Sequence, residues 1–449
     1  DKSGGLVGSE MCIRDSRTGE GPLDPEAAFA YVGHMLAAER LGDACADIPA
    51  AIGHATSQVH AMQGVAFLER VLAVERATTP DLQFTAFMQL ARLRRLLGQP
   101  EAAHAALKCA ARAAETACAG DLQGRVACEL ADAARVAGDT PEARRHAEQA
   151  LSLAEAVGSS ELRAQALHTL GAVAGSVGDH ARSADHLREA VALFEQLDDR
   201  RGAAASALEL GRVLQAVGDE PAAGEARAAA LAGFRAAGDT RGESAALNAV
   251  GDAWLDAGRP SKARECYEQA LHAARGIGDL PGEAQTLRNL ARTYALDARI
   301  EDARATFVAA LDMYRQLHDV AGEVGTLDEL GSALATVGDH DAAIGYLEEA
   351  SETARRTRQE ESLSRVRRHL ANVRHEAGNV DAAWADYDRA LELATPRQRV
   401  RTLADMGNAA LRQGDAERAV SLLSESRSAT APCADRLLAD CRLARALHE

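Results

Sequence analysis

Apolar residues recur along most of the chain with the period of about 3.6 that places them on one face of an α-helix. The stretch Ser244–Asp279 shows the pattern most clearly, as two amphipathic helices joined by a tight turn. The same pattern returns when the sequence is shifted by 40 residues in either direction. Self-similarity at a fixed period is typical of repeat proteins, so we expect an array of helical pairs.

The turns define the register of this array. Gly can adopt the left-handed conformation without a Cβ penalty and therefore suits the end of a helix, whereas the Asp or Pro that often follows suits the start of the next one. A second turn lies half a period later, so each repeat is predicted to contain two helices, A and B, of about 16 residues. The turn positions are Gly98, Gly138, Gly178, Gly218, Gly258, Gly338 and Gly378 for the first turn, and Gly158, Asp198, Gly238, Gly278 and His318 for the second.

Small residues recur where helices must approach closely. In helix A, a large apolar residue precedes Gly or Ala, as in Leu210-Gly211 and Val250-Gly251. A larger side chain in such a column would push two helices apart, at a cost of about 1–3 kcal/mol. Helix B has an Ala column and, three residues earlier, large residues expected to fill the space between repeats: Ala110, Ala150, Ala190, Ala230, Ala270, Ala310, Ala350 and Ala390, with Tyr267, Phe307, Leu347 and Tyr387.

This order of residues resembles the tetratricopeptide repeat from about Asp81 to the C-terminus, although the usual repeat has about 34 residues and this one has 40. Long repeats of this kind are similar to the sensor arms of bacterial MalT-like and other LuxR-family regulators, to signalling ATPases, and to adaptors related to kinesin light chain. The resemblance implies an all-α, right-handed superhelical solenoid of roughly nine antiparallel helix pairs, with the A helices lining a concave groove.

The two ends of the chain depart from the repeat. Residues 1–22 match nothing that follows, and we interpret them as adapter or vector-derived sequence that is expected to be disordered. Residues 23–80 are predicted to be an irregular helical segment or a degenerate repeat, in which Ala66–Arg76 resembles a helix B. Residues 81–449 form the predicted solenoid. Its junction at Pro396 is shortened, and its last repeat, from Ala431, is truncated.

Composition narrows the classes of function. The formal net charge of −17 argues against direct nucleic-acid binding, which requires a basic surface. No run of 18 apolar residues and no signal peptide are visible, so we expect a cytoplasmic protein without a membrane span. The eight Cys include no C-x-x-C pair and are interpreted as small buried residues rather than redox or metal-binding groups.

The sequence contains no recognisable catalytic constellation. It has no Gly-rich phosphate loop with Lys, no H-E-x-x-H and no G-x-S-x-G. His180 and His186, six residues apart on a predicted helix, face away from each other, and the fourteen His are scattered. We therefore expect no enzymatic activity, no cofactor and no metal site.

Polar residues that vary from row to row flank the nearly constant small column of helix A. This contrast is typical of a fixed scaffold that presents a specific surface, and Asn289 stands where long-repeat adaptors resemble one another in holding a peptide backbone. The alternative is that these residues are ordinary solvent-facing positions of amphipathic helices. The candidate groove residues are Glu209, Arg212, Asn248, Asp252, Arg288, Asn289, Arg292, Glu329, Arg368 and Asn372.

Two functions remain open from the sequence. The first is a scaffold whose groove binds a protein or peptide partner. The second is the ligand-sensing arm of a larger bacterial signalling protein or transcriptional regulator whose effector domain lies elsewhere. A basic run could add a patch for an acidic peptide or a neighbouring domain, or could be a solvated face: Arg355, Arg356, Arg358, Arg365, Arg367, Arg368 and Arg374. The oligomeric state cannot be deduced from these residues.

Overall fold

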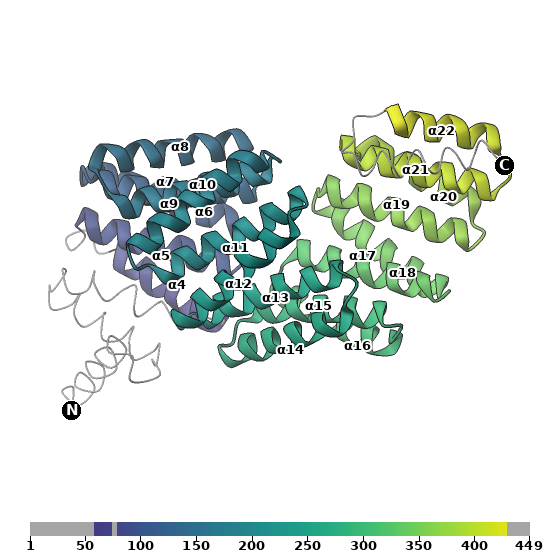
Figure 1. Cartoon of the computed structure of the whole chain (residues 1–449), viewed down its shortest axis with the longest axis horizontal. Helices are drawn as coiled ribbons and strands as arrows, with labels where there is room; N and C mark the ends of the chain where they lie inside the picture. Colours follow the sequence, from purple (N-terminus) through teal and green to yellow (C-terminus); the bar gives the residue numbers. More distant parts are fainter. Residues whose placement is uncertain (1–57, 74–78, 429–449) are drawn as a thin grey trace. The chain divides into compact units, whose positions relative to one another are not determined.

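The computed structural model describes residues 58–73 and 79–428 (Figure 1). Within these residues all regular secondary structure is α-helical, from α4 to α22. The chain divides into two compact units, and the division falls inside α15, between Glu283 and Ala284. The segments predicted at residues 1–22, 23–57 and 431–449 lie outside the described residues.

The first unit contains α4 (Gln58–Leu72), which includes the first part of the helix expected over Ala66–Arg76, and a series of A and B helices. Each A helix packs against the B helix that follows it, and α7, α9 and α11 also contact the next A helix. The A helices are α5 (Pro80–Leu96), α7 (Gly120–Val136), α9 (Ser160–Ser176), α11 (Arg200–Val217) and α13 (Thr240–Asp256). The B helices are α6 (Pro100–Thr116), α8 (Thr140–Val157), α10 (His180–Gln196), α12 (Glu220–Ala236) and α14 (Pro260–Gly276).

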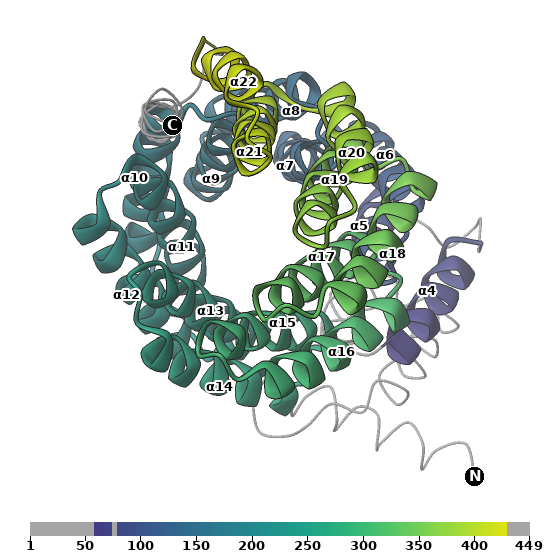
Figure 2. The same ribbon diagram turned by 90° about the vertical axis from the view of Figure 1, so that its right-hand side faces the viewer.

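The second unit continues the same arrangement, and the predicted all-α repeat fold is confirmed. Figure 2 shows that in both units the A helices line one side of the stack and the B helices the other. The remaining A helices are α15 (Leu280–Leu296), α17 (Val320–Thr336), α19 (Glu360–Glu376) and α21 (Pro396–Arg412). The remaining B helices are α16 (Ile300–Gln316), α18 (His340–Arg356), α20 (Val380–Leu393) and α22 (Ala416–Ser428).

The turn after α7 shows how each helix ends. Gly138 has a φ of +80°, and the N–H groups of Gly138 and Asp139 donate to the carbonyls of Arg135 and Ala134 at 3.1 and 2.9 Å. The Asp139 carboxylate then accepts the Glu142 N–H at 3.2 Å and caps α8. The predicted glycine turn positions all have positive φ: Gly98, Gly138, Gly158, Gly178, Gly218, Gly238, Gly258, Gly278, Gly338 and Gly378.

The same backbone conformation occurs where the sequence has no glycine. Five other turn residues have φ between 51° and 57°, four of them at the half-repeat turns and one, Ala298, at the first turn of its repeat. A side chain makes this conformation unfavourable, so the stacked helices impose it on these residues. They are Cys118, Asp198, Ala298, His318 and Arg358.

The small and large columns form the core, as predicted. Every Ala in the column from Ala110 to Ala390 is fully buried, and so are Tyr267, Phe307, Leu347 and Tyr387. Among the glycines of the small column of helix A, the approach is closest at Gly251, where an added Cβ would lie 2.5 Å from Cε1 of Tyr267. The Tyr267 hydroxyl donates to Asp252 at 2.7 Å, which holds the ring in place. This packing orients the opposite face of each A helix, where the candidate site lies.

Candidate functional site

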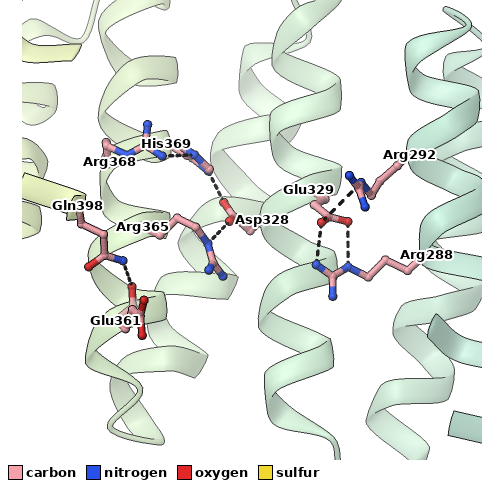
Figure 3. Close-up of polar contacts among 9 residues, drawn as sticks. All are labelled: Arg288, Arg292, Asp328, Glu329, Glu361, Arg365, Arg368, His369 and Gln398. Atoms are coloured by element: carbon pink, nitrogen blue, oxygen red, sulfur yellow. Dashed lines mark hydrogen bonds and ion pairs between the residues drawn. The ribbon is translucent and has the colours of Figure 1, made fainter. Parts of the chain in front are cut away.

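A ladder of charged side chains crosses the A helices of the second unit (Figure 3). We call it the polar ladder, and its first step joins α15 to α17. Arg288 donates two hydrogen bonds to Glu329, at 2.8 and 2.7 Å, in the bidentate geometry typical of strong charge-assisted pairs. Arg292, one turn further along α15, lies 3.9 Å from the same carboxylate. Glu329 therefore forms ion pairs with two arginines, and its contact with Arg292 is the weaker one.

The second step joins α17 to α19 through Asp328, whose side chain is only 5% exposed. Its carboxylate accepts from Arg365 at 3.0 Å and pairs with Nδ1 of His369 at 2.6 Å. Nε2 of His369 lies 2.7 Å from an Arg368 nitrogen, and because Arg can only donate, Nε2 must accept. The proton of the neutral ring is then on Nδ1, where it bonds Asp328.

The third step joins α19 to α21. Arg368 donates to Asp405 at 2.7 Å, and Asn372 donates to the same oxygen at 3.2 Å. The Asn372 carbonyl accepts the hydroxyl of Tyr387, which places this step directly above the core. Nearer the start of α19, the Gln398 amide donates to the Glu361 backbone carbonyl at 2.9 Å. Each A helix is thus connected to the next by side-chain contacts.

The electrostatics of the ladder favour the charged forms of Asp328 and Arg288. Burial by itself would raise the pKa of Asp328, but His369 and Arg365 outweigh burial and hold that pKa below its usual value. Burial would likewise lower the pKa of Arg288, yet Glu329 raises it. The ladder contains one more guanidinium than carboxylate: Arg288, Arg292, Arg365 and Arg368 against Asp328, Glu329 and Asp405.

The structure brings together five of the predicted groove residues within this ladder. Arg288, Arg292 and Glu329 form one group, and Arg368 and Asn372 meet at Asp405. Asn289, the residue expected to hold a peptide backbone, is 7% exposed, and its backbone carbonyl accepts the Thr293 hydroxyl at 3.0 Å.

The other four predicted residues lie in the first unit. Arg212 and Glu209 form a pair within α11, with nitrogen–oxygen distances of 2.5 and 3.1 Å. Asn248 is buried and donates to the Ser244 carbonyl one turn back on α13, at 3.0 Å. Asp252 accepts from Tyr267 as described above. The Asn248 contact therefore supports its own helix, and the Asp252 contact joins α13 to α14.

The list of candidate groove residues omitted Asp328, Arg365, His369 and Asp405, although these residues complete the ladder; Arg365 was considered only as part of the basic run. The signal for them lies in the spacing of opposite charges. The contacts join residues 37 or 41 positions apart, close to one 40-residue repeat, because successive A helices run side by side. A search for acidic and basic residues at those two separations finds the pairs.

Four of the seven arginines in the basic run pair with two sets of carboxylates, whereas Arg355, Arg356 and Arg358 are exposed. Arg365 and Arg368 belong to the ladder, whereas Arg367 and Arg374 both donate to Asp386, whose side chain is 3% exposed. These arginines are neither an open basic patch nor a purely solvated face. They neutralise buried acids between α19 and its neighbours.

Two further features bear on function. Within residues 58–73 and 79–428, no group of three or more His, Cys, Asp or Glu is arranged to hold a metal ion. Over the same residues, no helix has both the length and the apolar character needed to cross a bilayer.

Comparison with protein families matches the repeats directly. A tetratricopeptide-repeat family model matches residues 122–196 and 255–316, and a second model of this repeat matches residues 326–361. A search of curated proteins gave no match. The matched stretches fall in both compact units and follow the register of the described helices.

Solved structures of similar fold include a Rap protein complexed with Competence and Sporulation Factor, at 13% identity and a TM-score of 0.57, with 82% of this chain and 97% of that chain covered. Others are BtubC from P. vanneervenii (23% identity, TM-score 0.41, 48% and 89% covered) and a putative kinesin light chain of Podosopora anserina (22%, 0.34, 43% and 94%). At these identities the likeness concerns the fold alone. The family matches and the paired-helix fold together identify the chain as a protein of the tetratricopeptide-repeat type.

Proposed function

We propose that the chain is a protein-interaction scaffold, and that the polar ladder binds an extended segment of a protein partner through a partner carboxylate. The observation that carries the proposal is the unequal sharing of Glu329. Arg288 holds this carboxylate with two short bonds, while Arg292 lies 3.9 Å away with 39% of its side chain exposed. An incoming carboxylate would therefore form a new ion pair most readily at Arg292, because the existing contact that it would disrupt, between Arg292 and Glu329, is weak.

The geometry of the ladder supports an extended ligand. Its steps follow successive A helices, so a segment that crosses α15, α17 and α19 would meet a new set of side chains at each helix (Figure 3). The existing contacts fix the orientation of the guanidinium groups before binding, which reduces the entropy cost of association. The Rap protein of similar fold was solved with Competence and Sporulation Factor, which supports a binding role for a fold of this kind.

The test selects peptides from a random displayed library with the purified chain, and then measures their affinities by calorimetry. The selected peptides should be enriched in Asp and Glu. Arg292→Ala should weaken binding about tenfold, because a hydrogen bond to a charged group contributes about 1.5–3 kcal/mol. The matched control is Arg355→Ala, which removes an arginine paired with Glu352 at 2.6 Å on the B helix α18.

The control should change affinity less than twofold. Peptides that carry no acidic enrichment, or that bind the Arg292→Ala variant as tightly as the unchanged chain while its helicity is intact, would contradict the proposal. The second candidate function is the ligand-sensing arm of a larger signalling protein. A different observation favours it, a cavity within the first unit.

A further inference from the structure

The first unit contains a cavity of about 540 Å³, within the range typical of small-molecule sites. It lies against α5, α7, α9 and the start of α11, with one wall from the end of α10. None of the predicted groove residues lines it. Its lining is Met88, Arg125, Cys128, Glu129, Asp132, Gln165, His168, Thr169, Phe194, Asp199, Arg201, Gly202 and Ala205.

The charged groups on the α7 side of the cavity already have partners of opposite charge. Arg125 pairs with Asp121 at 3.2 Å and with Glu161 at 3.4 Å. Glu129 pairs with Arg95 at 2.6 Å, and Asp132 pairs with Arg135 at 3.0 Å. A charged ligand would have to displace one of these contacts.

The charged groups on the α11 side of the cavity also have partners, a backbone N–H for Asp199 and a carboxylate for Arg201. Asp199 caps α11 by accepting the Gly202 N–H at 2.9 Å. Arg201 pairs with Asp239 at 2.6 Å. Burial raises the pKa of the Cys128 thiol to about 12, and burial lowers the pKa of His168 below its usual value, so both groups are uncharged at neutral pH.

Two polar groups of α9 retain hydrogen-bonding capacity. Among the described residues, no group bonds the side-chain amide of Gln165, which carries two donors and an acceptor. His168 uses Nδ1 for the Ser206 hydroxyl at 3.0 Å, which leaves Nε2. Gln165 and His168 are three residues apart and so share one face of the helix. Met88 and Phe194 add apolar surface to the same cavity.

We infer that this cavity binds a small, planar, uncharged ligand with an adjacent hydrogen-bond donor and acceptor, a primary carboxamide or an amino-substituted heteroaromatic ring. The Gln165 amide can pair with such a donor–acceptor edge through two bonds, as Gln and Asn pair with adenine in nucleic-acid recognition. The planar body packs against the apolar side chains of Met88 and Phe194, which line the same cavity. The site lies wholly in the first unit, so the inference is independent of the role proposed for the ladder.

The test compares three nearly isosteric probes, benzamide, benzoate and benzamidine, which are neutral, anionic and cationic. Titration of the whole chain is followed by ligand-observed NMR. Benzamide should bind at least about tenfold more tightly than either charged probe, because an ion leaves the Gln165 amide half-paired and must displace an existing ion pair.

Two variants make the test specific. Gln165→Ala should weaken benzamide binding about tenfold without attracting either ion. Gln165→Glu replaces the amide by a carboxylate of the same shape and should reverse the preference towards benzamidine. The same substitutions at Gln196, an exposed residue of α10 outside the lining, should change neither affinity nor preference.

Three outcomes would overturn the inference: no benzamide binding at its solubility limit, tighter binding of benzoate than of benzamide, or an unchanged order of probes in Gln165→Glu. Circular dichroism at 222 nm shows whether each variant retains its helices.

Discussion

The close approach at Gly251 yields the sharpest quantitative prediction. Gly251 and Gly224 both lie inside helices of the first unit, in α13 and α12. An added Cβ at Gly251 would meet the Tyr267 ring at 2.5, 2.8 and 2.9 Å, whereas at Gly224 it would meet nothing within 4 Å. The substitutions Gly251→Ala and Gly224→Ala are therefore chemically identical and sterically opposite.

The magnitude follows from two terms. Ala is favoured over Gly in a helix interior by about 1 kcal/mol, so Gly224→Ala should stabilise the chain by about that amount. At Gly251 the same gain is opposed by overpacking, about 1–3 kcal/mol, and by loss of the Tyr267–Asp252 hydrogen bond, about 1 kcal/mol, if the ring moves. Tyr267 is fully buried and has no open space to enter. The two variants should therefore differ by about 2–4 kcal/mol.

The assay is urea unfolding followed by circular dichroism at 222 nm, for the unchanged chain and both variants. A double variant locates the cause: in the Tyr267→Ala background, Gly251→Ala should become stabilising, because the ring that it would contact is gone. If Gly251→Ala stabilises the chain as much as Gly224→Ala does, the ring does not pack against α13 as described, and the register of the helix pair is wrong.

Three other results are expected. Ala298→Gly should raise the stability by about 0.5–1 kcal/mol, because relief of a left-handed Cβ conformation exceeds the added chain entropy; a lower urea midpoint would contradict it. The pKa of Asp328 is lowered in the fold, so its stabilising effect is complete above its ordinary pKa of 3.8 and is lost as the pH falls below that value; the stability gap between the unchanged chain and Asp328→Asn should shrink between pH 4 and pH 2. With a thiol pKa of about 12, Cys128 should resist iodoacetamide at pH 8 while the exposed Cys118 reacts, as mass spectrometry of the peptides would show.

The fold could be predicted from the sequence because packing acts at every repeat. Ala270 is buried where two helices approach closely, and so are Ala230 and Ala310. The same steric requirement for a small residue therefore recurs in the sequence every 40 residues. Turn glycines repeat for an equally local reason, the absence of a Cβ. Among the five positive-φ residues other than Gly, Asp198 and His318 could be placed at turns by the register, whereas Cys118, Ala298 and Arg358 were not placed there, because the stacking of helices, and not the residue itself, selects their conformation.

The candidate site was only partly predictable, because a column shows where a side chain lies but not which group it contacts. Arg288 and Glu329 were selected as separate polar positions, and only the structure shows that they form one ion pair. Asp328 was missed because an acidic residue near an apolar column reads as a solvent-facing position, although it is buried between Arg365 and His369. Asn248 was selected by the same rule and proved to bond its own helix.

These contacts change what a variable polar column means in a repeat array. A polar side chain that differs from repeat to repeat can bind a partner or can contact the neighbouring A helix. The sequence alone does not distinguish these two roles. The two roles are distinguished by the ion pairs that each charged side chain already makes within the fold and by its exposed fraction. Arg368 is bonded to Asp405 and is 16% exposed, so its removal would loosen the joint between α19 and α21. Arg292 has a weak 3.9 Å contact with Glu329 and is 39% exposed, so its replacement should weaken partner binding more than it lowers the stability of the fold.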